Sequence, residues 1–182
     1  MPEIMIRPAV NADIQNLTGF YHSIETDAVW QMDEYSEKET IHIRFQEARL
    51  PRSMKVDYPY QPDRLMERWR FFTLTLIACI SNVPVGYVSV STLHSTRQIW
   101  IKDLVIDSPW RRKGIATALL RAVRDWGIDR NYDAILLEMS SKNYPMIRLS
   151  RELGFQFSGY NDHFYNNGDI ALFFVKQIKQ SF

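Results

Sequence analysis

A short basic turn with a single glycine carries the clearest chemistry in this sequence, Arg111-Arg112-Lys113-Gly114-Ile115-Ala116. A strand-like segment, 98–107, precedes the turn, and a helical pattern runs from Ile115 to about Trp126. The first turn of a helix has unpaired backbone N–H groups and lies at the positive end of the helix dipole. Because Gly114 has no Cβ, a ligand can approach the backbone closely there. The pattern predicts a pyrophosphate site, although a solvated basic turn before a surface helix is the alternative on these six residues alone.

Two carboxylates on predicted strands could take a proton from a reacting group. Glu138 lies in the apolar segment 134–139, where it is expected to be desolvated, as suits a general base. Its alternative role is structural, as the partner of an arginine. Asp103, within segment 98–107, is the second candidate. The single cysteine, Cys79, lies in an apolar run and is expected to be a buried, inert thiol.

Length and composition favour one globular domain spanning residues 1–182. The net charge is +1, with 22 basic and 21 acidic residues, so nothing global indicates nucleic-acid binding. No signal pattern and no apolar run near about 18 residues appear. These features predict a cytoplasmic protein that binds neither nucleic acid nor membrane. The oligomeric state is left open, with a homodimer among the options.

Within the N-terminal part of the chain, residues 25–61 are harder to interpret than the rest. We expect a strand over 4–8 and a helix from Asn11, as its cap, to about Ser23. Segment 36–50 is compatible with a helix whose charged residues face water. The aromatic residues of this region have two readings, as hydrophobic cover over a sheet or as a wall of a substrate site. They include Trp30, Tyr35, Tyr58 and Tyr60.

The remaining elements alternate between the two types of secondary structure, which predicts an α/β fold with a mixed sheet. A short helix is expected over 62–70, and two strands, 72–80 and 85–93, are joined by a hairpin turn. After strand 134–139, Asn143 precedes a helix that has Pro145 in its first turn and ends at Leu153. Gly154 supplies its left-handed cap, and strands 155–160 and 170–176 follow.

Three of these pieces, in this order, resemble the GNAT acetyltransferase superfamily. They are the strand ending at Asp107 with the basic turn after it, Leu137-Glu138 followed by Asn143, and the helix ending Leu153-Gly154-Phe155. The resemblance covers about residues 72–176. It implies a GNAT-like, mostly antiparallel twisted sheet with two central parallel strands that splay apart, flanked by helices.

The resemblance also implies an acetyl-CoA-dependent N-acetyltransferase. The pyrophosphate of acetyl-CoA would lie on the amides of residues 111–116, and the pantetheine arm would pair with the strand at Leu104, Val105 and Ile106. Asn143 matches a side-chain contact to CoA, or is only a helix cap. In such enzymes the acceptor amine attacks the thioester directly in a ternary complex, and the reaction needs neither a metal nor a nucleophilic cysteine. Glu138 matches a base position of some N-terminal acetyltransferases in this superfamily.

One position departs from the family pattern. Many members have a tyrosine four residues before the Gly-Phe pair, as the acid for the departing thiolate, and here that position is Ser150. Tyr165 or Tyr160 could substitute, or no acid is needed. A catalytically silent acyl-CoA-binding regulatory domain is therefore an alternative.

The C-terminal half is also similar to streptothricin acetyltransferases, which acetylate an amine of a cationic antibiotic. We therefore expect a small-molecule amine acceptor, cationic or antibiotic, with N-terminal acetylation of proteins or peptides as the alternative. Acidic and aromatic side chains are expected to attract such a cation. The candidates are Asp27, Asp33, Glu34, Asp162, Asp169, Trp30, Tyr35 and Tyr160.

Overall fold

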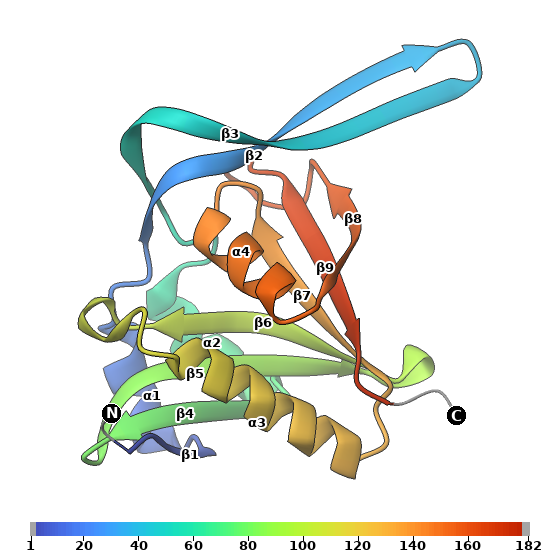
Figure 1. The fold of residues 1–182 in the computed structure, drawn as a ribbon. Helices are drawn as coiled ribbons and strands as arrows, with labels where there is room; N and C mark the ends of the chain where they lie inside the picture. The colour runs from blue at the N-terminus through green and yellow to red at the C-terminus, as the bar shows by residue number, and fades with distance from the viewer. Residues whose placement is uncertain (1–2, 180–182) are drawn as a thin grey trace.

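The computed structural model describes residues 3–179 and contains one seven-stranded sheet and a separate two-stranded hairpin. The strand order in the large sheet is β1-β4-β5-β6-β7-β9-β8, and every neighbouring pair except β6 and β7 is antiparallel (Figure 1). The strands of this sheet are β1 (Met5–Pro8), β4 (Leu74–Ile80), β5 (Val83–Leu93), β6 (Gln98–Ile106), β7 (Ala134–Ser140), β8 (Gln156–Asn161) and β9 (Ala171–Gln177). The expected mixed, mostly antiparallel sheet is confirmed.

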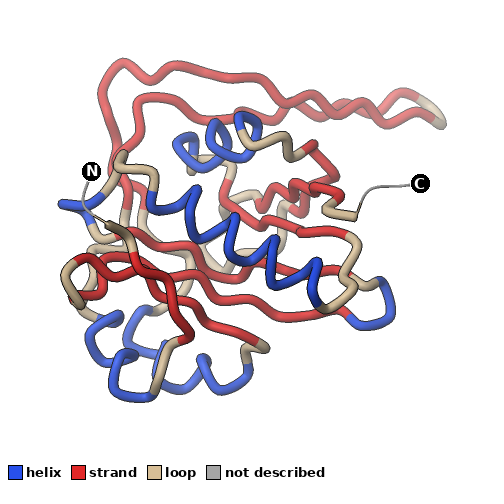
Figure 2. Tube along the Cα trace, turned by 60° about the horizontal axis from the view of Figure 1, so that its bottom comes forward, coloured by secondary structure: helices blue, strands red, loops and turns tan. Residues whose placement is uncertain are grey.

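Helices cover both faces of the sheet, because alternate residues of its central strands point to opposite sides. Val88 of β5 belongs to a core cluster with α3 and α4, whereas the neighbouring Tyr87 belongs to a second cluster with α1 and α2. Figure 2 shows the long helix α3 on one side of the sheet, and a group of short helices and turns that includes α1 and α2 on the other. The α-helices are α1 (Asn11–Thr18), α2 (Leu65–Arg68), α3 (Ile115–Asp129) and α4 (Tyr144–Glu152). Short 3-10 turns are η1 (Pro62–Arg64), η2 (Trp69–Phe71), η3 (His94–Thr96) and η4 (Ser108–Trp110).

The parallel strands β6 and β7 separate soon after they meet. They pair from Gln98 with Ala134 to Ile101 with Leu137, and beyond that point β6 continues on β5 while β7 continues on β9. A bulge opens at the same place, because Val90 of β5 pairs with Ile101 and Ser89 with Asp103, which leaves Lys102 as the extra residue. The splay implied by the family resemblance is therefore present.

The helix expected over 36–50 is wrong. The segment belongs to a long hairpin made of β2 (Ile24–Glu37) and β3 (Thr40–Val56), which turns at Lys38, a residue with φ of 51°. The helical interpretation followed the charges near the turn and overlooked the alternation Ile41-His42-Ile43-Arg44-Phe45, whose period of two is that of a strand.

The N-terminal helix is also shorter than expected. It ends at Thr18 instead of running to Ser23, and Val10, not Asn11, occupies the cap position. Asp13, the third residue of the helix, reaches back to this cap position, since its carboxylate accepts from the backbone N–H of Val10 at 2.8 Å. Asp13 also accepts two hydrogen bonds from Arg7 of β1, so this acid fixes the helix to the sheet.

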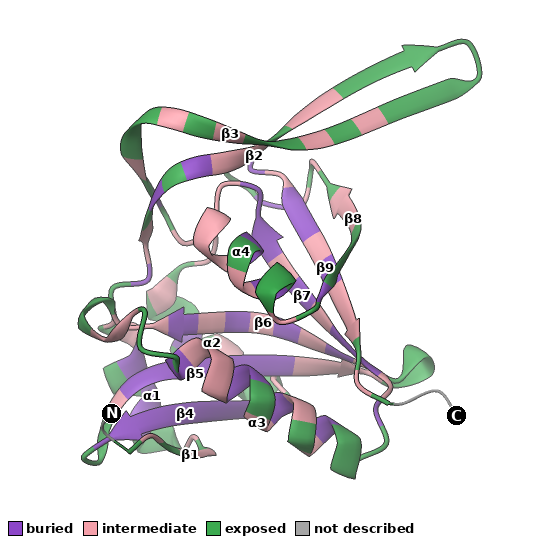
Figure 3. Cartoon of the chain, viewed as in Figure 1, coloured by how far each residue is buried: buried purple, intermediate pink, exposed green. Residues whose placement is uncertain are grey.

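The hairpin is anchored to the body at its base, and its outer part projects as an arm (Figures 1 and 3). The backbone N–H of Trp30 donates to the Ser141 carbonyl at 2.8 Å. The Trp30 ring packs near Phe45, Phe157 and Phe174. Trp30 is thus hydrophobic cover. Beyond this base, Ile41 remains 68% exposed, which shows that the arm packs little against the body. Within residues 3–179, no helix has both the length and the apolar character that a membrane crossing requires.

Candidate active site

Two adjoining cavities occupy the gap between β6 and β7. The outer cleft, about 280 Å³, runs from the start of α3 past β6 and α4, and the inner cavity, about 60 Å³, lies between β6, β7 and the segment 56–60. The cavities share six lining residues, so they meet at one place. These residues are His22, Ile24, Tyr58, Leu104, Asn143 and Met146.

The basic turn lines the outer cleft, but its three basic side chains have different contacts. Arg111 is held by backbone carbonyls, since it donates to Ile106 and Ser23 at 2.9 Å each and also to Tyr21. Burial lowers the pKa of this guanidinium. Lys113 donates to the Pro109 carbonyl at 3.0 Å, and Arg112 lines the cleft. Arg111 is therefore a brace between the turn and the segment before β2.

Gly114 precedes α3 as its cap residue, in a conformation that favours glycine. Its φ is +78°, and a Cβ built on it would meet nothing within 4 Å. The glycine therefore supplies a left-handed backbone and leaves open space before the helix. Ile115 and Ala116 line the cleft beside it, so the first N–H groups of α3 face a cavity large enough for a ligand.

The strand residues expected to contact a cofactor also lie on this cleft. Leu104, Val105 and Ile106 line it beyond the last pair of β6 with β7. Asn143 caps α4, because its side-chain oxygen accepts from the Met146 N–H at 3.2 Å, and it also lines both cavities. Asn143 can therefore cap α4 and line the cavities at the same time.

Glu138 points into the inner cavity, with its side chain only 1% exposed. One carboxylate oxygen lies 2.7 Å from the Lys102 Nζ, and the other accepts from the Tyr60 hydroxyl. Tyr165 lies beside Tyr60, with their rings 6.0 Å apart at a steep angle. Burial, and then the charge of Glu138, raise the pKa of both phenols, so both hydroxyls keep their protons. The partner of Glu138 is a lysine and not the arginine of the structural alternative.

Asp103 lies behind the shared wall, fully buried, and is absent from the described lining of either cavity. It accepts from the Tyr58 hydroxyl and pairs with Arg68 at 3.2 Å. His22 Nδ1 donates to the Phe20 carbonyl, and its Nε2 accepts from Tyr87 at 3.0 Å. Burial lowers the pKa of His22, which agrees with this neutral form. Polar groups therefore lie behind Tyr58. Burial raises the pKa of the Tyr58 hydroxyl well above its usual value.

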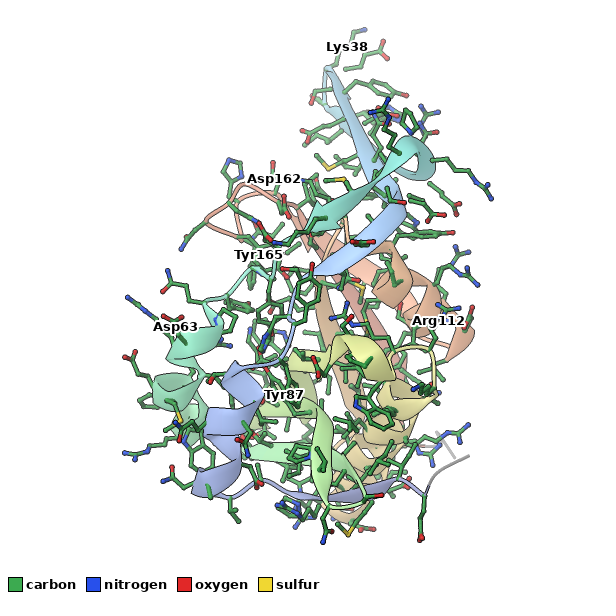
Figure 4. The ribbon with its side chains drawn as sticks, turned by 90° about the vertical axis from the view of Figure 1, so that its left-hand side faces the viewer. Lys38, Asp63, Tyr87, Arg112, Asp162 and Tyr165 are labelled. Carbon is green, nitrogen blue, oxygen red and sulfur yellow. The ribbon has the colours of Figure 1, made fainter. Side chains whose placement is uncertain are left out.

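The other hydroxyls expected at the site lie in different places. Ser150 is fully buried in α4 and donates to the Ile147 carbonyl at 2.8 Å, and among the described residues it lines neither cavity. Tyr160 packs on Phe45 under the hairpin. Tyr165 lines the inner cavity, and Figure 4 shows it on the opposite side of the view from Arg112, the basic residue of the outer cleft.

The acids and aromatics expected to attract a cation are not at the cavities. Asp33 pairs with Arg44 on the arm at 2.7 Å, where Tyr35 also stacks on His42. Asp162 pairs with His163, and Asp169 is buried against Ser140 and Lys142. In the described chain, the lining of both cavities omits all eight of those side chains.

Sequence reasoning missed the roles of several side chains that complete the site. Tyr58 and Tyr60 were noted only as aromatics, and Lys102, Arg68 and His22 were not noted at all. The alternation of Tyr58 and Tyr60 around Pro59 was a signal, since alternate residues of an extended segment can reach two neighbouring groups.

Comparisons with known proteins agree with this geometry. The family model described as "Acetyltransferase (GNAT) family" matches residues 30–155. The chain is 29% identical to streptothricin acetyltransferase of Streptomyces lavendulae over 92 residues, which are 48% of this chain and 49% of that protein. It is 28% identical to an N-alpha-acetyltransferase of Saccharolobus solfataricus over 134 residues, 67% of this chain and 79% of that one. It is 30% identical to human N-acetylaspartate synthetase over 88 residues, which are 48% of this chain and only 29% of that protein.

Solved structures show the same fold. A nourseothricin acetyltransferase has a TM-score of 0.81 at 21% identity, covering 97% of this chain and 99% of that one. A putative streptothricin acetyltransferase from Bacillus anthracis, in complex with acetyl coenzyme A, has a TM-score of 0.76 at 17% identity, covering 96% and 99%. The family match spans more than half of the sequence, and both the separation of β6 from β7 and the basic turn before α3 fit it. The chain belongs to the GNAT family of acetyltransferases, which use acetyl-CoA.

Proposed function

We propose that this chain transfers the acetyl group of acetyl-CoA to a small primary amine by direct attack in a ternary complex. The observation that carries the proposal is the meeting of two cavities at six shared residues, with a buried carboxylate, Glu138, in the inner one. A cofactor in the outer cleft and an amine in the inner cavity would meet there, and holding both together favours reaction.

The outer cleft would hold the cofactor. The pyrophosphate would lie on the first N–H groups of α3, with Arg112 as the adjacent cation and Arg111 bracing the turn from behind. The pantetheine arm would run along Leu104, Val105 and Ile106, where β6 has separated from β7. The thioester would then reach the shared wall beside Tyr58 and Asn143.

Glu138 would take the proton of the acceptor ammonium, because its carboxylate lies at the inner cavity with two hydroxyls nearby. Tyr58 is a better candidate than Tyr165 to face the departing sulfur, since Tyr58 lines both cavities and Tyr165 only the inner one. The raised pKa of Tyr58 suits a hydrogen-bond donor to the thiolate more than a full proton donor. Its hydroxyl, which here donates to Asp103, would turn toward the sulfur.

The inner cavity supports a small acceptor. At about 60 Å³ it has room for only a few atoms, and Pro59, Tyr60 and Tyr165 wall it off. An ammonium would find the Glu138 carboxylate and the aromatic faces that favour a cation. The similarity to streptothricin acetyltransferase supports a cationic acceptor, whereas the similarity to an archaeal N-alpha-acetyltransferase makes a protein N-terminus the second candidate.

An acceptor screen tests this proposal. CoA release from acetyl-CoA is measured with polyamines, aminoglycosides, streptothricin, amino acids and short peptides, at low and high salt. We expect turnover with small cationic amines that falls with salt, because screening weakens their attraction. Turnover confined to peptides would favour N-terminal acetylation, and none with any amine despite acetyl-CoA binding would favour a silent regulatory domain.

Replacing Gly114 tests the phosphate site. Gly114→Val should weaken acetyl-CoA binding by about tenfold or more, near 1.4 kcal/mol, because a branched side chain would fill the space before α3. The matched control is Gly168→Val, since Gly168 also has a positive φ, +77°, and open surroundings but lies outside the cleft. Calorimetry should show near-normal affinity for the control. Equal losses in both variants would mean that strain alone, and not phosphate contact, explains the effect.

Glu138→Gln keeps the shape of the side chain and removes the proton acceptor. We expect kcat to fall by about 10²-fold, with acetyl-CoA affinity little changed. Near-normal kcat for the variant from about pH 6 to 9 would point instead to Asp103 or to water.

The three candidate hydroxyls can be ranked by removing each. Tyr58→Phe should lower kcat by about tenfold, the scale of one lost hydrogen bond to a developing charge. Tyr165→Phe should act mainly on the KM of the amine, and Ser150→Ala should leave both constants near normal. A kcat loss largest for Tyr165→Phe would restore that residue as the donor to the sulfur.

A further inference from the structure

Lys102 holds an unusual place for a lysine. It is the bulged residue at the point where β6 and β7 part, and its side chain lines the inner cavity at 18% exposure. Its Nζ lies 2.7 Å from the Glu138 carboxylate, 3.7 Å from the centre of the Trp100 ring and 5.7 Å from that of Phe164. One carboxylate and two aromatic faces therefore enclose a primary amine beside the group assigned as the base.

We infer that Lys102 is itself an acetylation site, modified by acetyl-CoA bound to the same chain when the inner cavity holds no other amine. The inference rests on the proposed function, because an acceptor amine must lie beside Glu138 for its proton to be removed. The Lys102 Nζ already lies there. A free amine would compete with Lys102 for this position and would protect it.

The reaction balances without a further reactant. Glu138 takes one proton from the Lys102 ammonium, and the nitrogen lone pair then attacks the carbonyl carbon of the thioester. The new C–N bond forms, the C–S bond breaks, and the second proton lost by the nitrogen passes to the departing thiolate to give CoA. The product is a neutral amide, so Glu138 loses its cationic partner.

Other lysines show that pairing with a carboxylate does not by itself mark the site. Lys142 pairs with Asp169, a carboxylate that is only 5% exposed, yet Lys142 is absent from the described lining of both cavities. Lys142 therefore provides an internal control within the same protein. It should react with acetyl-CoA only by uncatalysed chemistry.

The test is peptide mass spectrometry of the full chain after incubation with acetyl-CoA and no acceptor. We expect one acetyl group on the Lys102 peptide, formed at least about tenfold faster than on Lys142, because the bound reactants are held together. Lys102→Arg should abolish that label, Glu138→Gln should slow it, and Lys142→Arg should leave it unchanged. Acetyl-CoA calorimetry on each variant confirms that the cleft is intact. An amine that is turned over should reduce the label.

Two results would overturn the inference while leaving the proposed function in place. One is a protein that transfers acetyl to a small amine but leaves Lys102 unmodified when acetyl-CoA is supplied without any amine. The other is equal labelling of Lys102 and Lys142. Labelling of Lys102 that persists at the wild-type rate in Glu138→Gln would overturn the role of the base in it. Absence of both acetyl-CoA binding and transfer to any amine would overturn the proposed function, and this inference with it.

Discussion

The early separation of β6 and β7 is the constraint on which the rest of the structure depends. After four residue pairs each strand is held by its other neighbour, so the facing edges carry backbone groups without a strand partner. Buried N–H and C=O groups must find other partners. An extended ligand with amide groups, such as pantetheine, can serve as that partner, and the side chains beside the gap can form its end wall. The defect in the sheet therefore creates the cleft.

Two carboxylates on these strands are each held by a tyrosine from one short segment. Tyr58 donates to Asp103 on β6, and Tyr60 donates to Glu138 on β7. Each acid also has a cation, Arg68 for Asp103 and Lys102 for Glu138. Buried charges are costly without such partners. The N-terminal half of the chain thus supplies side chains that the two strands need, and this ties the hairpin to the chemistry of the sheet.

The sequence was most informative where local patterns decide the structure. The basic turn, the amphipathic face of α3, the Asn143 cap and the left-handed Gly154 all depend on neighbouring residues, and they were predictable. The hairpin was not predicted because its charged turn resembles a helix surface. The brace role of Arg111 could not be predicted, because its partners at Tyr21 and Ser23 are about ninety residues away in sequence.

The same limit applies to the side chains that surround Glu138. Lys102 reaches it because a bulge interrupts β6, and nothing in the local pattern marks that bulge. Tyr60 and Tyr165 reach it from segments on either side of β7 in the chain. A carboxylate in an apolar strand indicates a buried acid, but which cation neutralises it depends on the packing of distant segments. The sequence therefore predicted that Glu138 is buried, but it did not predict which side chains surround this carboxylate.

The self-paired arm has a consequence for how this protein can change over evolutionary time. Between Trp30 and Glu47 its two strands pair with each other in unbroken register, while Trp30 fixes the base to the body. Residues added or removed in matched pairs at the tip would preserve the alternation of faces below it and leave Tyr58 and Tyr60 where they are. A single residue inserted between Trp30 and the tip on one strand would instead reverse the faces beyond it. The arm can thus vary in length in even steps while the gap between β6 and β7 stays unchanged.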